Sequence, residues 1–326
     1  MRTRTCLSII LLCLLVLTGL LAGCGGMKPT GGNSGAATYS VTDDQGTVIT
    51  FKEPPRHIYA NTVSLEEVLL DLVPPERIAA VTASNKDRRI SFVADKADRV
   101  ERTLPEKPSL ETVLSIRPDL VLAQDKARPE FIKALRDAGI PVFVMEVPVT
   151  LPKIRQRILK LGEVTGEKEK AAAVVADLDR KVAAVHEVTD RIPMENRRII
   201  MAYSLNGVFG SPQGLFHHIC LEAGVQNGAA LAGLKRGDHV SKEQILRVDP
   251  DILIFPDYSS TVEGDATAFR QSVITDPALQ PVKAVRNGRI LVIHDRYRYA
   301  ASQYVGDAIR DIAEKCYPEY FTKQYK

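Results

Sequence analysis

The longest regular pattern of apolar and polar positions runs from about Glu167 to Asp190. Apolar residues recur there every three or four positions, the spacing of one helical face, at Ala171, Val174, Val175, Leu178, Val182 and Val185. Charged residues, among them Lys170, Asp177 and Arg180, lie at other positions of the same stretch. A helix of this length spans roughly 35 Å, about the width of a small domain. The pattern therefore predicts one long amphipathic helix near the middle of the chain.

Two similar segments flank this helix, residues 109–123 and residues 241–255, and they begin 132 positions apart. Both carry Ser, Glu, Leu, Pro and Asp at equivalent places. Each segment predicts a short helix capped by a serine, Ser109 or Ser241, followed by a buried strand. Because the midpoint of the pair falls within the long helix, we predict two similar lobes joined by that helix.

Short apolar runs alternate with helical patterns in both halves of the chain. The runs that predict strands are residues 56–60, 78–82, 120–123, 140–145, 198–203, 252–255 and 289–293. The predicted helices are residues 64–72 with Ser64 as the cap, 109–117, 129–138, 151–161, 215–223, 241–247, 278–285 and 301–316. A hairpin is expected at residues 39–51, around Asp43 to Gly46. Such alternation is typical of parallel sheets that helices cover on both faces.

The first residues of the chain have the pattern of a secretory signal. Arg2 and Arg4 precede an apolar run that ends in Leu21, Ala22, Gly23 and Cys24. A cysteine directly after Leu-Ala-Gly resembles the cleavage box of bacterial lipoproteins, which implies cleavage before Cys24 and acylation of its thiol. An uncleaved anchor or a simple secretory peptide is the alternative. Residues 25–38 are rich in Gly and predict a flexible tether.

Charge gives no sign of a nucleic-acid partner. The chain has 43 basic and 40 acidic residues, and removal of Arg2 and Arg4 with the signal leaves 41 basic residues. A protein so close to neutrality has no strong field that would attract nucleic acid. Two cysteines remain beyond Cys24, Cys220 and Cys316, in a compartment where a disulfide is permitted. The sequence leaves open whether these two thiols are close enough to bond.

Several short stretches together resemble the substrate-binding lipoproteins of ABC importers for iron complexes and cobalamin. The matching stretches are the lipoprotein box and residues 41–46, 54–58, 109–123, 138–142, 221–227, 240–243 and 284–289. The resemblance implies an α/β fold of two Rossmann-like lobes with mostly parallel sheets, a single long helical spine and a ligand cleft between the lobes. On this basis we divide the chain into a signal (1–23), a lipidated tether (24–38), a first lobe (39–150), a helical linker (151–190) and a second lobe (191–326).

The resemblance also implies a function. We expect a monomer, anchored by lipid to the extracytoplasmic face of the membrane, that passes a ferric siderophore or haem to a permease dimer with its cytoplasmic ATPase. Cobalamin is the alternative ligand. The absence of Trp favours an iron complex, because cobalamin sites in this family often use Trp. We expect no cofactor of the protein's own and no enzymatic activity, since no catalytic motif is present. An extracellular hydrolase and a purely structural lipoprotein are the remaining alternatives.

Glu111 and Glu243 occupy the same place in the two repeated segments, in the first turn after the capping serine. The family resemblance implies that glutamates at these positions face the permease and meet arginines. The alternative is a structural role, because a carboxylate near a helix N-terminus stabilises the helix by roughly 0.3–1 kcal/mol.

The resemblance places the ligand site in loops from both lobes, at the ends of the strands. The first-lobe loops are residues 84–89, 103–104 and 124–126, and the polar segment 84–102 is either a solvated face or the rim of the cleft. The second-lobe loops are residues 203–209, 235–239, 258 and 295–299. The candidate ligand-binding residues are Arg88, Arg89, Leu104, Tyr203, Phe209, His239, Tyr258, Asp295, Arg296, Tyr297 and Tyr299. Their aromatic faces suit a large planar or macrocyclic ligand, and their arginines suit carboxylates.

The six histidines form no tight cluster of the kind that a bare zinc or manganese site needs. His57 and His186 are expected to be structural, and the adjacent His217 and His218 point in different directions. His239 and His294 lie near the predicted cleft loops. A haem iron held by one Tyr or His is therefore more plausible than a bare metal ion.

Overall fold

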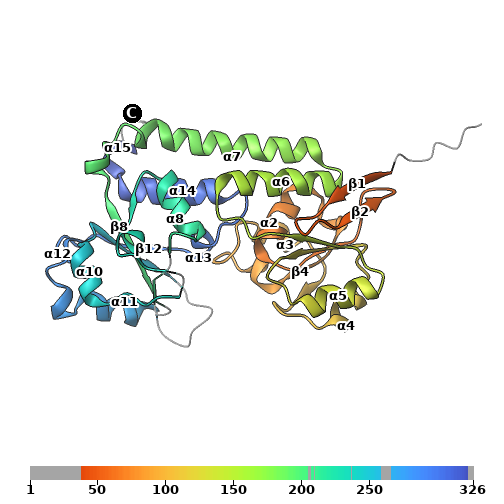
Figure 1. The fold of residues 1–326 in the computed structure, drawn as a ribbon, viewed down its shortest axis with the longest axis horizontal. Helices are drawn as coiled ribbons and strands as arrows, with labels where there is room; N and C mark the ends of the chain where they lie inside the picture. Colours follow the sequence, from red (N-terminus) through yellow and green to blue (C-terminus); the bar gives the residue numbers. More distant parts are fainter. Residues whose placement is uncertain (1–37, 205–206, 209, 236, 258–265, 322–326) are drawn as a thin grey trace, which may run out of the picture. The chain divides into compact units, whose positions relative to one another are not determined.

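The computed structural model describes residues 38–204, 207–208, 210–235, 237–257 and 266–321 (Figure 1). Its longest helix, α7, runs from Lys168 to Thr189, which confirms the helix predicted from the apolar stripe. Ala171, Leu178, Val182 and Val185 of that stripe are buried. None of the helices that the structure describes has the length and apolar character needed to cross a bilayer.

The first lobe is built on a parallel sheet with the strand order β5-β4-β3-β6-β7. Its strands are β3 (Ile58–Ala60), β4 (Ile78–Thr82), β5 (Thr103–Leu104), β6 (Leu120–Gln124) and β7 (Val142–Met145), and an antiparallel hairpin, β1 (Tyr39–Thr42) and β2 (Val48–Phe51), precedes them. Its helices are α2 (Val63–Leu72), α3 (Ala94–Ala97), α4 (Leu110–Ser115), α5 (Pro129–Asp137) and α6 (Leu151–Thr165). β3, β4 and β7 are buried at every residue, as expected of a sheet covered on both faces.

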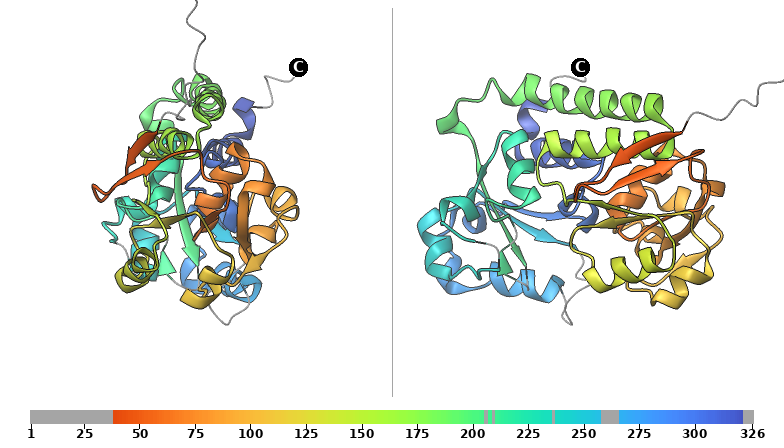
Figure 2. Two further views of the ribbon diagram at one scale, coloured as in Figure 1. Left: turned by 90° about the vertical axis from the view of Figure 1, so that its right-hand side faces the viewer. Right: turned by 45° about the vertical axis from the view of Figure 1, so that its right-hand side comes forward.

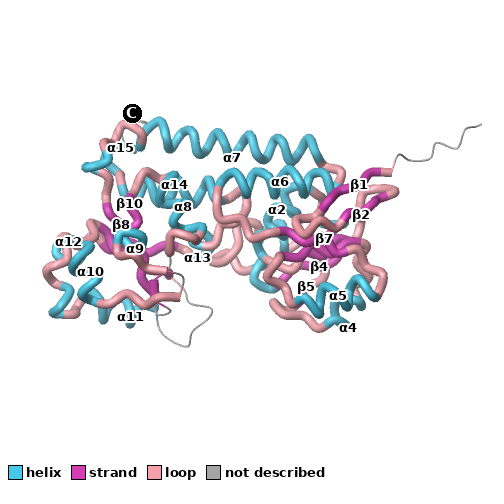
Figure 3. Tube along the Cα trace, viewed as in Figure 1, coloured by secondary structure: helices cyan, strands magenta, loops and turns pink. Residues whose placement is uncertain are grey.

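The second lobe repeats this plan with the parallel order β10-β8-β11-β12 (Figure 3). Its strands are β8 (Ile199–Ser204), β10 (Gln226–Asn227), β11 (Ile252–Pro256) and β12 (Ile290–Ile293), and β9 (Gly207–Val208) pairs antiparallel to β8. Its helices are α8 (Leu215–Glu222), α9 (Gly228–Leu231), α10 (Lys242–Val248), α11 (Ala266–Ile274), α12 (Lys283–Arg286), α13 (Asp295–Arg298), α14 (Val305–Cys316) and α15 (Pro318–Phe321). The predicted α/β class with two mostly parallel sheets is confirmed.

The internal repeat is visible in individual hydrogen bonds. Asp119, just before β6, accepts the backbone N–H of His57 at 2.9 Å and thereby holds the start of the neighbouring strand β3. Asp251, just before β11, accepts the backbone N–H of Ile199 at 2.8 Å, at the start of β8. Each aspartate follows by two positions a residue with a φ of 47°, Arg117 or Asp249. The two lobes therefore share the same hydrogen bond, which we call the clasp, from an aspartate before one strand to the backbone at the start of the neighbouring strand.

Helix α7 packs closely on two neighbours, α6 and α14, which lie along it (Figure 2). A Cβ atom on Gly162 of α6 would lie 2.3 Å from the Cβ of Ala171 in α7. A Cβ atom on Gly306 of α14 would lie 2.9 Å from the Cδ1 of Leu178 in α7. A larger residue at position 162 must move α6 and α7 apart, whereas one at position 306 requires the side chain of Leu178 or the helices to shift, so both glycines permit the close packing of the spine.

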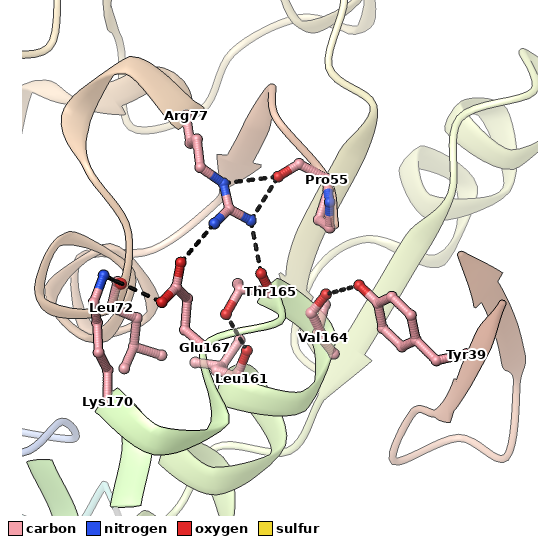
Figure 4. A network of polar contacts seen from close by, with 9 residues as sticks. All are labelled: Tyr39, Pro55, Leu72, Arg77, Leu161, Val164, Thr165, Glu167 and Lys170. Carbon is pink, nitrogen blue, oxygen red and sulfur yellow. Dashed lines mark hydrogen bonds and ion pairs between the residues drawn. The ribbon is translucent and has the colours of Figure 1, made fainter. Parts of the chain in front are cut away.

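A polar network fastens the beginning of α7 to the first lobe (Figure 4). The guanidinium of Arg77 donates to the carbonyl of Pro55 at 2.8 and 3.0 Å and to the carbonyl of Thr165 at 2.7 Å. It also pairs with Glu167 at 2.9 Å, and Lys170 pairs with the same carboxylate at 3.1 Å. Arg77 therefore ties the turn between α6 and α7 to the loop that contains Pro55.

The predicted cap at Ser64 is wrong. Helix α2 begins at Val63 with Thr62 at the N-cap position, and no side chain caps it. Ser64 lies inside the helix, where its hydroxyl accepts hydrogen bonds from Gln124 at 3.1 Å and from Arg157 at 3.2 Å. The hydroxyl of Ser64 therefore binds side chains from later parts of the chain instead of capping the helix.

Two predicted helices of the second lobe also differ from the structure. Residues 278–285 form two short pieces, a 3-10 turn at Pro277–Leu279 and α12, because Pro281 has no amide hydrogen with which to continue a helix. Helix α14 begins at Val305 rather than at residue 301. The residues just before it bind side chains of the first lobe instead. Helix α11 was not predicted.

Candidate functional site

The two lobes touch where segments that follow β4 and β12 meet. The backbone N–H of Arg296 donates to the carbonyl of Arg89 at 3.2 Å, and its guanidinium donates to the carbonyl of Arg88 at 3.2 Å. In a parallel sheet the carboxyl ends of the strands form the edge at which ligands bind. The contact between the lobes therefore lies at the edge where a ligand site is expected. We call the segments 83–92 and 294–304 together the interlobe junction.

Aromatic rings from both lobes stack at this junction. Phe92 lies parallel to the ring of Tyr304 with centroids 4.7 Å apart, and edge-on to Tyr297 at 5.2 Å. The guanidinium of Arg296 lies 5.1 Å from the centroid of Phe92 and 5.2 Å from that of Tyr297. Cation–π contacts of this kind favour burial of the rings and keep the charge of Arg296 at the junction.

A buried carboxylate joins the lobes beside these rings. Glu67 of α2 accepts the backbone N–H of Phe92 at 3.0 Å and the hydroxyl of Ser302 at 2.6 Å. Its own backbone carbonyl accepts the side-chain amide of Gln303 at 2.9 Å. Burial raises the pKa of Glu67 to about 7, against the lowering effect of these hydrogen bonds. The first lobe thus holds the segment before α14 through a carboxyl group that titrates near neutral pH.

The neighbouring residue, Glu66, is also fully buried, but it faces the first lobe's own sheet. Its carboxylate accepts the backbone N–H of Thr82, the last residue of β4, at 3.0 Å from both oxygens, and it contacts the amide of Asn85. Asn85 in turn accepts the hydroxyl of Ser91 at 2.6 Å. Burial raises the pKa of Glu66 to about 8. These bonds shape the segment that leaves β4 and enters the junction.

A histidine and an aspartate pair at the carboxyl ends of two adjacent strands of the second lobe. Asp257 follows β11 and His294 follows β12, directly after the paired residues Pro256 and Ile293. The Nδ1 of His294 contacts the carboxylate of Asp257. About half of the His294 side chain is exposed, against 22% for Asp257. His294 lies two residues before Arg296, within the junction, and its contact with Asp257 ties the end of β11 to the junction.

The structure brings some of the predicted ligand-binding residues together. Arg88, Arg89, Arg296 and Tyr297 all lie in the interlobe junction. Arg88 pairs with Asp95 and Asp98, and Arg89 pairs with Asp87, and these two arginines remain more than half exposed. Both guanidinium groups therefore reach the surface of the junction while paired with carboxylates of the first lobe.

Asp295 and Tyr299 also lie in the junction, whereas Leu104, Tyr203 and His239 lie outside it. Leu104 is buried in the core of the first lobe, and Tyr203 packs edge-on to Phe269 at 5.0 Å. Asp295 is buried and pairs with Arg298 at 3.3 Å, and burial raises its pKa. The exposed residues are His239 and Tyr299. Phe209, Tyr258 and Cys24 lie outside the described residues.

Glu111 and Glu243 have the same surroundings in the two lobes. Each is exposed in the first turn of its helix, α4 or α10. The hydroxyl of the capping residue, Ser109 or Ser241, lowers the pKa of each carboxyl group. In Figure 1 both helices lie on the side of the protein away from α7. Two like-charged carboxylates are thus presented by equivalent elements of the two lobes.

Two open depressions lie at the opposite, amino ends of the strands, with volumes of about 560 and 550 Å³. The first is lined by His57, Arg99, Arg102 and Arg117, and the second is lined by residues that include Arg197, Arg198 and Arg289. Ligands of open α/β sheets bind at the carboxyl ends of the strands. We therefore place the candidate site at the interlobe junction and not in these depressions.

Other reactive groups give no second site. No group of three or more His, Cys, Asp or Glu side chains suited to a metal ion occurs among the described residues. Cys220 and Cys316 are free and fully buried, and burial raises the pKa of both thiols. His186 pairs with Glu222 at 3.0 Å.

Sequence reasoning missed the carboxyl groups of the junction. Glu66 and Glu67 are adjacent carboxylates between the apolar residues Leu65 and Val68 of α2, and this break in the apolar run is the signal that could have revealed them. The pairing of Asp257 with His294 has a weaker signal, because each follows a short apolar run that predicts a buried strand. Residues that follow two strands can be predicted to lie side by side only when the order of the strands in the sheet is known.

Three comparisons bear on the identity of the chain. A model for the family described as periplasmic binding protein matches residues 59–297. A cobalamin-binding protein of Halobacterium salinarum is 25% identical over 267 residues, which cover 80% of this chain and 70% of that protein. The uncharacterized ABC transporter substrate-binding lipoprotein YvrC of Bacillus subtilis is 23% identical over 318 residues, 94% of this chain and 96% of that one.

Solved structures show the same fold. The periplasmic heme-binding protein RhuT from Roseiflexus sp. RS-1, in its apo form, superposes with a TM-score of 0.69 at 22% sequence identity. The superposition covers 81% of this chain and 98% of that protein. The arrangement of two lobes and a helical spine is therefore shared with a binding protein of known structure.

Proposed function

The chain belongs to the family of periplasmic binding proteins, and we propose that it captures an iron complex between its lobes and delivers it to an ABC importer. It is a substrate-binding protein of the iron-siderophore, haem and cobalamin family, which consists of transport proteins and not of enzymes. This sets aside the hydrolase alternative. The ligand we propose is a ferric siderophore or haem. Cobalamin is the second candidate, favoured by the relative from Halobacterium salinarum.

The observation that carries this proposal is the interlobe junction. It joins the carboxyl-end segments of two parallel sheets, and it holds aromatic rings from both lobes and exposed arginines of the first lobe. Rings of this kind suit a large planar or macrocyclic ligand, and guanidinium groups suit its carboxylate or chelating oxygens. His239 and Tyr299 are exposed and are proposed as further contacts, together with Phe209 and Tyr258, which lie outside the described residues.

The proposal is tested by titration of the purified full-length protein with a ferric siderophore, haemin and aquocobalamin. A true ligand should quench Tyr fluorescence along a saturable curve. It should also stabilise the folded state, by about 2.7 kcal/mol at a free concentration 100 times its dissociation constant. The iron-free siderophore and the metal-free porphyrin are the controls. Absence of both saturation and stabilisation with all three complexes refutes the proposed function.

Delivery to the permease is proposed to depend on Glu111 and Glu243. An importer with two like permease subunits presents two like surfaces, and one glutamate meets each. Such rim charges act mainly on orientation and association rate. Glu111→Arg or Glu243→Arg should therefore reduce uptake and permease association while ligand affinity in solution stays unchanged, and the double reversal should be worse than either single one.

Glu169 provides a matched control for these reversals. Glu169 is an exposed glutamate in the first turn of α7. Glu169→Arg therefore places a positive charge near a helix N-terminus, as the two reversals do, but away from the proposed docking helices. We expect it to leave uptake unchanged. Equal loss of uptake in the Glu169→Arg variant would show that the effect comes from the helix and not from docking.

Membrane attachment is proposed to occur through a lipid on Cys24. Support comes from the lipoprotein box in the sequence and from the similarity to a substrate-binding lipoprotein. Cys24→Ser should release the protein from membranes into the soluble fraction. Retention of the variant in washed membranes contradicts the lipid anchor.

A further inference from the structure

We infer that the open depression of the first lobe, at the amino ends of its strands, binds phosphodiester head groups of a membrane. The head groups that fit carry hydrogen-bond donors at their far end, as that of phosphatidylglycerol does. This inference rests on the proposed lipid anchor, because a lipid on Cys24 holds the first lobe close to a membrane. It concerns a surface apart from the interlobe junction. We call this surface the first-lobe depression, and the residues that line it include His57, Glu76, Arg99, Glu101, Arg102 and Arg117.

Three arginines supply the positive charge of the first-lobe depression, whose volume is about 560 Å³. Arg99 and Arg102 come from the segment between α3 and β5, and Arg117 comes from the segment between α4 and β6. All three are exposed, and within the described part of the chain their side chains have no ion-pair or hydrogen-bond partner. Guanidinium groups that surround one hollow suit a phosphate, because its oxygens accept several N–H donors at once.

Two carboxylates narrow the choice of phosphate ligand. Glu76 and Glu101 line the same depression and are exposed. They repel a bare phosphate, but they can accept hydrogen bonds from hydroxyl or ammonium groups on the same ligand. The head group of phosphatidylglycerol has such hydroxyls, whereas the quaternary nitrogen of phosphatidylcholine has no hydrogen to donate. The mixed charge of the depression therefore favours a phosphodiester with donors at its far end.

The frame of the depression is held by backbone hydrogen bonds. The carboxylate of Asp119 accepts the N–H of Arg56 at 2.6 Å and that of His57 at 2.9 Å. The N–H of Val81 in β4 donates to the carbonyl of Arg102 at 3.0 Å. The segments around the hollow are thus fixed to the sheet before a ligand binds, which lowers the entropy cost of binding.

The predicted tether joins the first lobe beside the depression. The hydroxyl of Tyr39 donates to the carbonyl of Val164 at 2.9 Å, and the next carbonyl, that of Thr165, accepts from Arg77 at 2.7 Å (Figure 4). Arg77 directly follows Glu76, which lines the depression. A flexible chain of about 14 residues has an average span of roughly 20 Å. A lipid at the far end of the tether therefore keeps the depression within reach of the head groups.

The depression of the second lobe lacks this availability. Its Arg198 pairs with Glu319, and its Arg289 donates to the carbonyl of Cys316 at 3.4 Å. Arg197 also donates to a backbone carbonyl, at 3.3 Å. The lobe that carries the tether is thus the one whose depression presents arginines without partners in the described chain.

Helix α4 links the depression to the proposed docking surface. It carries Glu111 in its first turn and ends at Ser115, two residues before Arg117. A helix of this length rises roughly 9 Å. A head group held in the depression therefore keeps the proposed docking carboxylate close to the membrane in which a permease lies.

The test uses the lipidated full-length protein in vesicles of phosphatidylglycerol or of phosphatidylcholine. Phenylglyoxal labels accessible arginines, and mass spectrometry measures the labelling of each one. Phosphatidylglycerol should protect Arg99, Arg102 and Arg117, and phosphatidylcholine should leave them reactive. High salt should remove the protection, because it screens the charges. A basic side chain near an anionic membrane contributes about fivefold to affinity, so Arg102→Gln should raise by about fivefold the lipid needed to protect the other two.

Arg247→Gln is the matched control. Arg247 is exposed in the last turn of α10, the helix that the internal repeat relates to α4. This variant removes the same charge from the other lobe and should leave the protection of all three arginines unchanged. Arg102→Gln should keep the thermal unfolding midpoint of the wild type, because its side chain makes no bond within the described chain.

The outcomes separate this inference from the proposed function. Retention of the protein in phosphatidylcholine vesicles reports the lipid anchor alone. Equal labelling of retained protein in the two kinds of vesicle overturns the inference and leaves the anchor and the binding of cargo standing. Equal protection by glycerol 3-phosphate without vesicles, at the same phosphate concentration, shows a free phosphate ligand and also overturns the contact with a membrane. Loss of the protein from phosphatidylcholine vesicles refutes the anchor, and this inference fails with it.

Discussion

Substitution of Glu67 by Gln is the sharpest test of how the buried junction responds to pH. A glutamine keeps the size of the side chain and resembles the protonated carboxyl group. Its oxygen can still accept the N–H of Phe92, and its amide can donate to the hydroxyl of Ser302, which the carboxylate now accepts at 2.6 Å. The variant therefore removes the titration of this group and keeps most of its contacts.

The expected magnitude follows from the pKa of Glu67. Burial raises this pKa from an ordinary 4.5 to about 7, which corresponds to about 3 kcal/mol of folding free energy. Below pH 4.5 the group is protonated in both folded and unfolded protein, so the stabilising effect of the proton is fully present. Between pH 4.5 and 7 the unfolded protein ionises first and the folded protein loses this stability. Above pH 7 both forms are ionised and the loss is complete.

Urea unfolding of both proteins between pH 4.5 and 8.5 measures this effect. Relative to Glu67→Gln, the wild type should lose about 3 kcal/mol as the pH rises through this window. Glu66→Gln is the matched control within the same helix. Because the pKa of Glu66 is raised further, to about 8, its difference from the wild type should continue to grow up to that pH. A constant difference between wild type and Glu67→Gln across the range would refute the reasoning.

Three further predictions concern the spine and the repeat. Arg77→Met should lower the free energy of unfolding by about 2 kcal/mol in urea titrations, because it leaves the carbonyls of Pro55 and Thr165 without their charged donor. Asp119→Ala and Asp251→Ala should each lower the free energy of unfolding by about 1 kcal/mol, because each removes the equivalent hydrogen bond between two strands. A large difference between the two losses contradicts the equivalence of the lobes. X-ray scattering curves with and without ligand should nearly superimpose, because a continuous helix links the lobes, and a large contraction on binding contradicts this.

The long helix and the parallel sheets could be predicted because their signals are local. The apolar stripe of α7 and the short buried runs are readable from spacing alone, and the duplicated segments 109–123 and 241–255 gave the relation between the lobes. The clasp made by Asp119 and Asp251 lies within those segments, so the repeat extends to single hydrogen bonds. These features depend on few contacts that are distant in sequence.

Two of the errors arose where distant contacts override local preference. Ser64 has the residue type of a helix cap, but Arg157 and Gln124 bind its hydroxyl. Residues 301–304 fit a helical pattern, but Ser302 and Gln303 bind Glu67 instead. The same cause hid the junction itself, since the partners of Glu67 can be named only when the lobes are placed together. A local pattern gives no information about such partners.

The bond between Glu67 and Ser302 also constrains the order in which the protein can be completed. The two residues are 235 positions apart, so the first lobe leaves the ribosome long before the hydroxyl that its buried carboxylate requires. Until then the incomplete first lobe either exposes this part of α2 to water or buries the carboxylate of Glu67 without the hydroxyl of Ser302. Either state is less stable than the complete fold. Contacts of such separation slow folding, because a long loop must close before they form. The segment just before α14 therefore completes the first lobe, and a polypeptide truncated before Ser302 should remain an easy substrate for proteases.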